Sequence, residues 1–356
     1  MLCSRYLSVA MLLFSPFCLS CDLNVSGRVN AALPSLRDAQ SPRQILLSNN
    51  IELQVPDADG VLAMHSADGL ALIDQIAAWP TDSGQISSIK AQPVALDWNY
   101  DGITDALYIV DAAGLLWFVT LNETGFSEPL LVADFSQTQA EFRQPLQLAQ
   151  VLAPDGQGAM QRQTMLLLTG SLAEGDILLA VKHNLQRLTP WQLTDLTDRT
   201  QLGGDESHSG IAAQLWLQIQ QGGGWYVRLN QRVMTKPDIY AGVVYVTGAH
   251  PDAVNSDCVL TDDAESQLHA FHLHHAGLVY ARRNWDITQQ RKGKLLLQEQ
   301  DGQLVLSLQD DAQQQALLTE LQAIDASCAD CVTPLDDMPF PRLIRLATFQ
   351  IEQDAH

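Results

Sequence analysis

Short apolar segments separated by turn residues run along most of this 356-residue chain, and they limit the folds open to it. Many are almost continuously apolar, which predicts sheets that are buried on both faces. Three tight pairs predict hairpins with Asp or Gly at the bend: VLAMHSADGLALI, ALYIVDAAGLLWFV and LVLSLQDDAQQQALL. Strands are also expected at AAQLWLQIQ and LHAFHL, and the only helix is expected from Asp311 to Ala323.

The fold class expected from this pattern is all-β and β-propeller-like. Stacked propeller blades bury both faces of each sheet, whereas a sandwich buries only one. We expect about five blades of short antiparallel strands, forming an incomplete propeller, over residues 44–350. The repeats are too degenerate for sequence periodicity to fix the blade count.

The acidic stretch from Asp97 to Asp105 has the spacing of a metal-binding loop. Oxygen donors at alternate positions can all turn inward on a tightly curled backbone, and Gly102 permits the sharp bend. The expected ligands are four side chains and one carbonyl group: Asp97, Asn99, Asp101 and Asp105, with the carbonyl of Ile103. An EF-hand would have a bidentate Glu where Tyr108 stands, and helices instead of strand-like flanks. The pattern therefore predicts a Ca²⁺ site between two β-strands, and the alternative is a turn rich in Asp and Asn without a metal.

The first 20 residues have the features of an export signal. Arg5 provides the positive charge, and the apolar run YLSVAMLLFSPFCL is too short to span a bilayer. Cleavage occurs either near Ser20 or before Cys21, and in the second case Cys21 carries a lipid anchor. Residues 21–43 are polar and turn-rich and are expected to form a tether. The protein is therefore expected in the periplasm, at the outer membrane or on the cell surface.

The net charge limits the classes of binding partner that are expected, and the cysteines indicate a disulfide. A formal net charge of −21 argues against nucleic acid, because phosphate binding requires clustered Lys and Arg. It also argues against an anionic membrane surface, which leaves the lipid anchor as the only expected membrane contact. Cys258, Cys328 and Cys331 are expected to form a structural disulfide, and the sequence leaves the pairing open.

Other polar clusters have weaker patterns. The segment from Asp205 to Ser209 spells an Asp-x-Ser-x-Ser adhesion motif, but no buried strand precedes it, so a solvated loop is expected. Four histidines invite a zinc interpretation, but without a third ligand on one strand face they are expected at the surface: His269, His272, His274 and His275. The Asp-rich turns, Asp57, Asp59, Asp68 and Asp74, could pair as in a glycosidase, although such turns are expected at this net charge. No catalytic motif is present, so an enzyme is not expected.

Four segments, in order along the chain, resemble the C-terminal propeller of the PilY-type proteins, which are tip-associated adhesins and biogenesis factors of bacterial type IV pili. They are residues 57–80, the calcium hairpin 97–119, FRQPLQLAQVL with TMLLLTGSLAEGD, and GGWYVRLNQRVMTKPDIYAGVVYVTGAHP followed by Cys258 and SQLHAFHLHHAG. The matching positions are Tyr108, Asp111, Gly114 and Trp117 in the calcium hairpin, and Arg232, Pro237, Gly242 and Tyr245 in the last segment.

This resemblance implies a calcium-responsive propeller that influences pilus assembly and retraction, with pilin, minor pilins or other tip components as partners. No counterpart of the family's large N-terminal adhesive region is expected here, so the resemblance does not imply adhesion through that region. Two alternatives stay open. The first is a calcium-dependent carbohydrate- or protein-binding module of the cell envelope unrelated to pili, using Trp98 and Trp225. The second is an enzyme related to quinoprotein propellers.

Overall fold

The computed structural model describes most of the chain between residues 44 and 334. The described residues are 44–48, 51–54, 60–66, 71–99, 103–122, 124–154, 160–183, 187–203, 206, 210–253, 260, 265–289, 293–300, 302–309, 314–324 and 332–334. The expected leader, the tether, the acidic residues Asp57, Asp59 and Asp68, and the three cysteines Cys258, Cys328 and Cys331 lie outside this set.

The first two sheets follow one another along the chain. The first has the order β1-β2-β3-β4 and is antiparallel throughout. Its strands are β1 (Gln44–Ser48), β2 (Ile51–Gln54), β3 (Leu62–Ser66) and β4 (Leu72–Ile76). The second has the order β13-β9-β7-β6-β5, with β8 paired to β7. Its strands are β5 (Val94–Leu96), β6 (Ala106–Val110), β7 (Leu115–Asn122), β8 (Gly125–Phe126), β9 (Leu130–Asp134) and β13 (Trp191–Gln192), and the 3-10 helix η1 (Ser136–Thr138) follows β9.

The third sheet has the order β10-β11-β12-β15-β14. Its strands are β10 (Gln147–Pro154), β11 (Met160–Leu172), β12 (Gly175–His183), β14 (Leu196–Asp198) and β15 (Gly224–Leu229). The 3-10 helix η2 (Leu193–Asp195) precedes β14, and the helix α1 (Ala213–Gln221) connects β14 to β15. The expectation of antiparallel strands holds for most pairs, but β13 with β9 and β14 with β15 are parallel.

The remaining strands form two larger sheets and one small pair. The fourth sheet has the order β16-β18-β19-β20 with β17 on β18, and the fifth has the order β21-β22-β23. The strands are β16 (Arg232–Val233), β17 (Asp238–Tyr240), β18 (Val243–Ala249), β19 (Ser266–His272), β20 (Asn284–Ile287), β21 (Lys294–Gln300), β22 (Gln303–Gln309) and β23 (Gln314–Leu318). The 3-10 helix η3 (Pro251–Ala253) follows β18, and β24 (Gln322–Ile324) pairs with β25 (Val332–Pro334).

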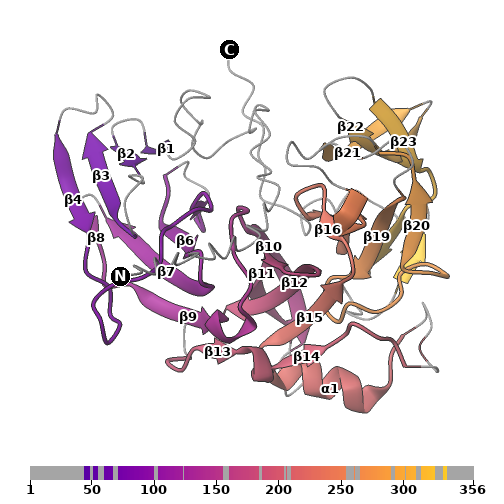
Figure 1. Cartoon of the computed structure of the whole chain (residues 1–356), viewed down its shortest axis with the longest axis horizontal. Coiled ribbons are helices and arrows are strands. Elements are labelled where there is room, and N and C mark those ends of the chain that lie inside the picture. The colour runs from indigo at the N-terminus through magenta and orange to yellow at the C-terminus, as the bar shows by residue number, and fades with distance from the viewer. Residues whose placement is uncertain are drawn as a thin grey trace, which may run out of the picture.

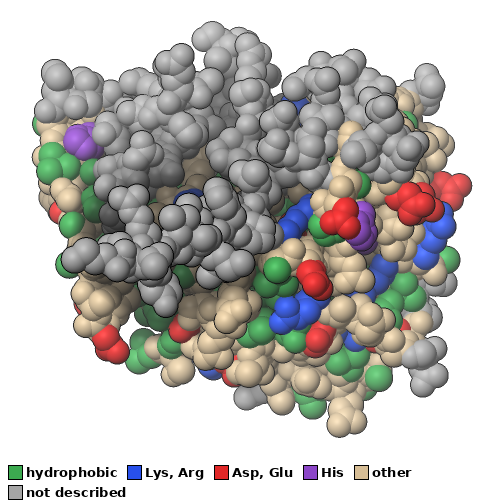
Figure 2. Space-filling view, viewed as in Figure 1, with side chains coloured by type: hydrophobic (Ala, Val, Ile, Leu, Met, Phe, Trp, Pro, Cys, Tyr) green, Lys and Arg blue, Asp and Glu red, His purple; other side chains and the backbone are tan. Residues whose placement is uncertain are grey.

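Together these sheets form an arc, from indigo β1–β4 on the left of Figure 1 to β21–β23 on the right. Described sheets of four, six, five, five and three strands succeed one another around this arc. The expected mostly-β, propeller-like architecture is therefore confirmed. Figure 2 shows acidic and basic side chains interspersed on the right of the face in view.

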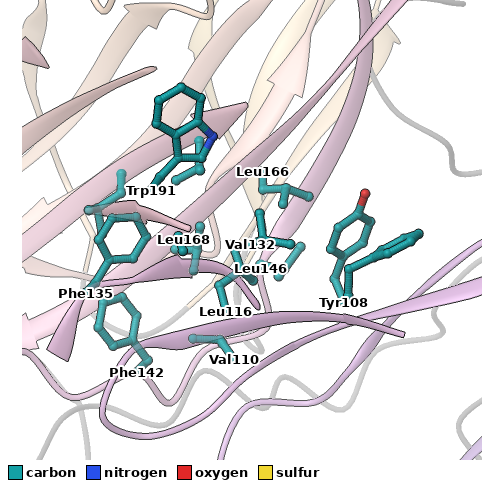
Figure 3. Packing of buried hydrophobic residues seen from close by; sticks show 14 of the residues in the cluster. Tyr108, Val110, Leu116, Val132, Phe135, Phe142, Leu146, Leu166, Leu168 and Trp191 are labelled. Carbon is teal, nitrogen blue, oxygen red and sulfur yellow. The ribbon is translucent and has the colours of Figure 1, made fainter. Parts of the chain in front are cut away.

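The inner sheets pack on both faces, as their apolar strands predict. Along β6, Leu107 and Ile109 pack with first-sheet residues, whereas Tyr108 and Val110 pack against β11 and β12 of the third sheet. Figure 3 shows the second of these layers, which contains Tyr108, Val110 and Leu166. Burying one such apolar side chain contributes about 1.5–3 kcal/mol, so the stack of sheets is the main source of stability.

The same alternation recurs on β18 of the fourth sheet. Val244 and Val246 pack toward the third sheet, and Val243 and Tyr245 pack toward the fifth. A strand has a side-chain period of two, so each strand supplies both of the layers that flank it.

The prediction of the helix was wrong in its position. Residues 314–318 and 322–324 are strands, and the hairpin of β22 with β23 confirms the competing hairpin prediction for the same segment. The helix is instead α1, within the stretch AAQLWLQIQ that was expected to be a strand. Ala, Leu and Gln favour helices, and Ile219 is buried on the side that faces the third sheet.

Candidate metal loop and its surroundings

The predicted metal loop connects two paired strands. β5 and β6 pair antiparallel, with Leu96 opposite Ala106, so residues 97–105 form the connection between them. The amide of Asp105 donates to the carbonyl of Leu96 at 2.9 Å and closes the base of the loop. The flanks are therefore strands, as the sequence predicted, and not the helices of an EF-hand.

The described ends of the loop are held in place by hydrogen bonds. The amide of Trp98 donates to Oδ2 of Asp105 at 2.8 Å, and the amide of Leu121 on β7 donates to the carbonyl of Asp105 at 2.8 Å. Asp97 is only 5% exposed. Burying a carboxylate is costly unless it is paired, hydrogen-bonded or bound to a cation.

The expected ligands are oxygen donors distributed along this one loop. Asp97 and Asp105 lie at the two ends of the loop, Asn99 and Ile103 lie between them, and Asp101 lies outside the described residues. Among the described residues no group of three His, Cys, Asp or Glu side chains converges on a point, so a complete set would need Asp101. Carboxylate, amide and carbonyl oxygens are the donors that Ca²⁺ prefers. The Ca²⁺ site remains a prediction.

An aromatic cluster lies behind this loop and connects it to the third sheet. The ring of Trp98, which is 39% exposed, lies 6.5 Å from that of Phe118 between centroids. Phe118 lies 5.0 Å from Tyr108 and 4.6 Å from His183 of β12. The hydroxyl of Tyr108 lies 2.6 Å from Nδ1 of His183, and burial lowers the pKa of His183 to about 4. The imidazole is therefore neutral near pH 7 and shares a hydrogen bond with the Tyr108 hydroxyl.

Asp111, one of the positions that carry the family resemblance, supports the hairpin of β6 with β7. It is fully buried, and its Oδ1 accepts hydrogen bonds from three successive amides, those of Ala113, Gly114 and Leu115, at 2.8–3.1 Å. Its Oδ2 accepts from the amide of Ser87 at 2.9 Å. Gly114 has a φ of +99°, and an added Cβ would lie 2.6 Å from Phe142. Burial raises the pKa of Asp111, and the backbone hydrogen bonds oppose this rise.

Replacing Asp111 by Asn is expected to lower the free energy of unfolding by about 1–3 kcal/mol. The amide group of Asn donates where Oδ2 accepts, so the Ser87 amide would lose its partner. Chemical denaturation at pH 7 measures the change. The matched control is Asp82→Asn on an exposed turn; equal losses from both variants would contradict the bonding role of Asp111.

The other predicted sites are placed differently from the expectation. The four histidines are buried, at 8%, 0%, 8% and 1% exposure for His269, His272, His274 and His275, so the expected surface position was wrong. β19 ends at His272, so His274 lies in the following turn and not on the same strand face. Both faces of β19 are covered by neighbouring sheets, which the sequence pattern around these residues did not reveal.

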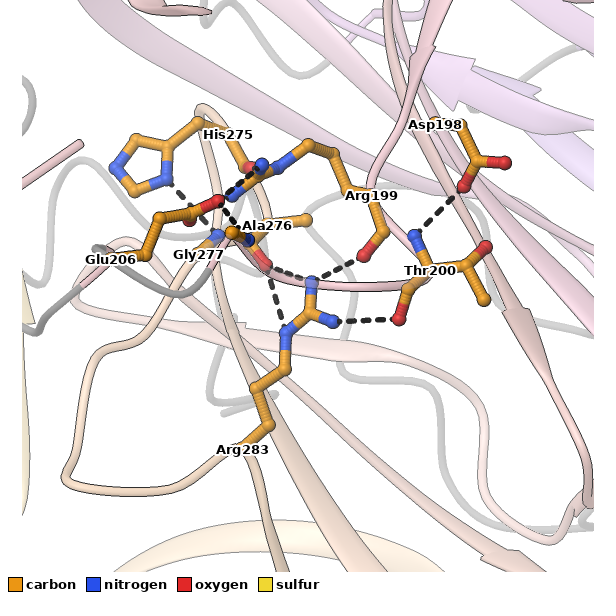
Figure 4. Close-up of polar contacts among 9 residues, drawn as sticks. Asp198, Arg199, Thr200, Glu206, His275, Ala276, Gly277 and Arg283 are labelled. Carbon is orange, nitrogen blue, oxygen red and sulfur yellow. Dashed lines mark hydrogen bonds and ion pairs between the residues drawn. The ribbon is translucent and has the colours of Figure 1, made fainter. Parts of the chain in front are cut away.

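Trp225, expected at an exposed carbohydrate site, is also fully buried. Its Nε1 donates to the carbonyl of Leu273 at 2.8 Å. Within the expected solvated loop, Glu206 forms a two-pronged ion pair with Arg199, with 3% and 7% of the Arg and Glu side chains exposed (Figure 4). The Oδ2 atom of Asp74 accepts from the amide of Phe126 at 2.7 Å and links the first two sheets.

The comparisons with known proteins give only distant likenesses. Neither a protein family nor a protein of curated function matches the sequence. The C-terminal domain of Pseudomonas aeruginosa PilY1 is similar in structure, with a TM-score of 0.43 and 13% identity over 75% of this chain and 68% of that one. A europium-containing methanol dehydrogenase has a TM-score of 0.35 and 10% identity, over 80% of this chain and 48% of that one. No helix in the described part of the chain is long and apolar enough to cross a membrane.

Proposed function

We propose that the protein is an exported, non-enzymatic interaction protein whose 97–105 loop binds one Ca²⁺. The observation that carries this proposal is the hairpin of β5 with β6, which holds Asp97 and Asp105 at the two ends of one loop while keeping Asp97 buried. The side chains of Asp97, Asn99, Asp101 and Asp105 and the carbonyl of Ile103 would hold the ion.

The ion would act by neutralising a set of carboxylates that repel one another. The amide of Trp98 already bonds to Asp105, so closing the loop also fixes the indole of Trp98 against Phe118. In this way an ion in the loop would order the edge of the second sheet. A loop with three carboxylates and no bidentate Glu should bind Ca²⁺ with a Kd on the order of 10⁻⁶ to 10⁻³ M.

Titration calorimetry tests the site. Ca²⁺ added to the wild type is expected to give saturable heat with a stoichiometry of about one. The variant Asp101→Ala is expected to bind at least about tenfold more weakly, which corresponds to a loss of about 1.4 kcal/mol. The control Asp252→Ala removes an acidic side chain that is 94% exposed and should leave the heat unchanged. Equal heats from the wild type and Asp101→Ala would refute the site.

For the partner, we propose a component of the type IV pilus system. The support is the sequence resemblance of the calcium hairpin and of the segment around Trp225 and Tyr245. The test is binding of purified pilin and minor pilins from the same source to the immobilised full chain, with Ca²⁺ and with chelator. We expect the chain to bind pilin or a minor pilin only when Ca²⁺ is present, and we expect Asp101→Ala to abolish this binding. Failure to bind any of them, with the calorimetric site intact, would reject the pilus assignment and keep the calcium site.

One observation favours a second candidate, a calcium-dependent carbohydrate-binding module. Trp98 and Ile103 are both exposed on the loop itself, at 39% and 53%, and an exposed indole beside an ion can stack on a sugar ring. A glycan array with and without chelator separates this function from the first. Glycan binding that requires calcium and is lost in Trp98→Ala would favour it.

A further inference from the structure

The last residue of β19 and the turn after it, residues 272–277, join the third and fourth sheets; we name this segment the histidine turn. The carbonyl of Leu273 accepts from Nε1 of Trp225 on β15 at 2.8 Å, and the carbonyl of His275 accepts from Nε of Arg199 at 2.8 Å. The carbonyl of Ala276 accepts from Nε of Arg283 at 3.1 Å (Figure 4). Arg199, Trp225 and Arg283, which lie on three different segments, are therefore hydrogen-bonded to this one turn.

Two imidazoles inside the turn act as hydrogen-bond acceptors for its own backbone. Nδ1 of His275 accepts from the amide of Gly277 at 3.0 Å, and Nδ1 of His272 accepts from the amide of His274 at 3.2 Å. A neutral imidazole has a single N–H group, so both rings must carry their proton on Nε2. The two rings are stacked, with centroids 3.7 Å apart and 14° between their planes.

Protonation of either ring is incompatible with this arrangement. The added proton would go to Nδ1, where it would point at a backbone N–H and replace a hydrogen bond by two opposed donors. In addition, both Nε2 atoms are buried and reach no hydrogen-bond partner among the described residues. The Nε2 atoms of both rings thus lack an acceptor among the described residues, and only the backbone carbonyl of His275 itself favours a charged ring there.

The charged groups around the turn oppose a further positive charge as well. Arg199 and Arg283 face His275, Lys182 faces His274, and Glu206 is already paired with Arg199. From α1, Trp216 presents its ring edge-on to His274 and His275 and supplies no charge. Burial lowers the pKa of His272 and His275 well below the ordinary value, and the neighbouring imidazoles lower it further.

We propose that the histidine turn is an acid-responsive latch: proton uptake by His272 and His275 opens the turn and releases the contacts between the third and fourth sheets. The latch uses residues far from the metal loop along the chain and does not depend on the proposed calcium function. Acid would weaken the contact between the third and fourth sheets, while the hydrogen bonds between the strands within each sheet are kept.

Titration of the full chain with ¹⁵N-labelled histidines tests the first step. At neutral pH, His272 and His275 are expected to show an unprotonated Nδ1. They should stay neutral until the pH is at least about one unit below the ordinary imidazole pKa of about 6.5, and then change together. Protonation of both rings near pH 6.5 would overturn the proposal.

The matched variant is His272→Asn with His275→Asn. The Oδ1 atom of Asn stands close to the position of Nδ1 and can accept the same amide, but it takes up no proton. Hydrogen exchange of residues 272–277 and of β15 is expected to speed up in acid in the wild type, and the variant should shift this midpoint down by about one pH unit. The control His250→Asn should leave the midpoint of hydrogen exchange unchanged. If the double variant does not fold, the single variant His275→Asn is measured in its place.

Two results would contradict the latch. An unchanged acid midpoint in the double variant would show that other groups trigger the opening. Simultaneous loss of protection in all sheets at the wild-type midpoint would show global unfolding and no release of this one contact between sheets.

Discussion

Replacing Arg232 by Met is expected to lower the free energy of unfolding by about 3–5 kcal/mol at pH 7–8. Arg232 begins the fourth sheet, and its Nη1 donates to Oδ1 of Asp176 on β12 at 2.9 Å. The same guanidinium donates to the carbonyls of Leu172, Ala173 and Gly175 at 2.6–3.1 Å. The variant would leave a carboxylate that is 1% exposed without its cation, together with three carbonyls without this donor.

The pH dependence of this loss provides a second check. Burial raises the pKa of Asp176, and Arg232 and the amide of Val233 oppose the rise. Without Arg232 the pKa should rise further, so Asp176 in the variant takes up a proton as the pH falls. The difference between wild type and variant is therefore expected to be smaller at pH 5 than at pH 8.

Denaturant unfolding at the two pH values measures both effects. The matched control is Arg228→Met on the neighbouring strand, where the side chain is exposed and a change within about 0.5 kcal/mol is expected. The double variant Arg232→Met with Asp176→Leu should recover part of the loss, because it removes the uncompensated charge. A loss of the same size from Arg228→Met would contradict the assignment of the ion pair as the bond between these sheets.

The second large effect is expected at His269. Burial, with a smaller contribution from the nearby Arg283, lowers the pKa of His269 to about 4. In the unfolded chain the imidazole binds its proton near pH 6.5. Neutral His269 therefore makes its full contribution to the free energy of unfolding above the unfolded pKa. About 3 kcal/mol of this contribution is lost as the pH falls toward 4. The buried carboxyl groups of Asp111 and Asp176, whose pKa values burial raises, oppose this trend in the whole protein.

The variant His269→Gln isolates the contribution of this one group. Nε2 of His269 lies 2.6 Å from Oε1 of Gln231, and the amide nitrogen of Gln can donate in its place without titrating. The free energy of unfolding of the variant is expected to fall less steeply than that of the wild type between pH 7 and pH 4. The control His250→Gln alters a side chain that is 64% exposed and should follow the wild type. Parallel curves for wild type and His269→Gln would disprove the assignment.

The strands and hairpins could be predicted because their apolar runs reflect burial on both faces. The three hairpins expected from the sequence are present as β3 with β4, β6 with β7 and β22 with β23. Helix α1 was missed because Leu215, Leu217 and Ile219 alternate with other residues like a strand. The helix presents Ile219 to the core and ends at Gln221 with Gly222 as its C-cap, and Nζ of Lys182 reaches the carbonyls of Ile219 and Gln220 at this end.

The burial of the histidines and of Trp225 could not be predicted, because it depends on which sheets pack together. His269 lies on β19, and Trp225 on β15 reaches the turn after β19 through a contact between residues 48 positions apart. Sequence period tells which side chains share a face but not whether another sheet covers that face. The metal loop could be proposed from the sequence for the opposite reason, since all its expected ligands lie within nine consecutive residues.

Terbium luminescence tests the central claim, which is that the 97–105 loop binds Ca²⁺ through oxygen ligands. Tb³⁺ has the same preference for oxygen donors as Ca²⁺, and a tryptophan close to the bound ion sensitises its emission. Trp98 lies within the loop, so excitation of tryptophan is expected to produce emission from bound Tb³⁺. Added Ca²⁺ should displace the Tb³⁺ and remove this emission. The variant Trp98→Phe should weaken the emission, and Asp101→Ala should abolish it. Emission that is missing in the wild type, or that persists unchanged in Asp101→Ala, would contradict the account.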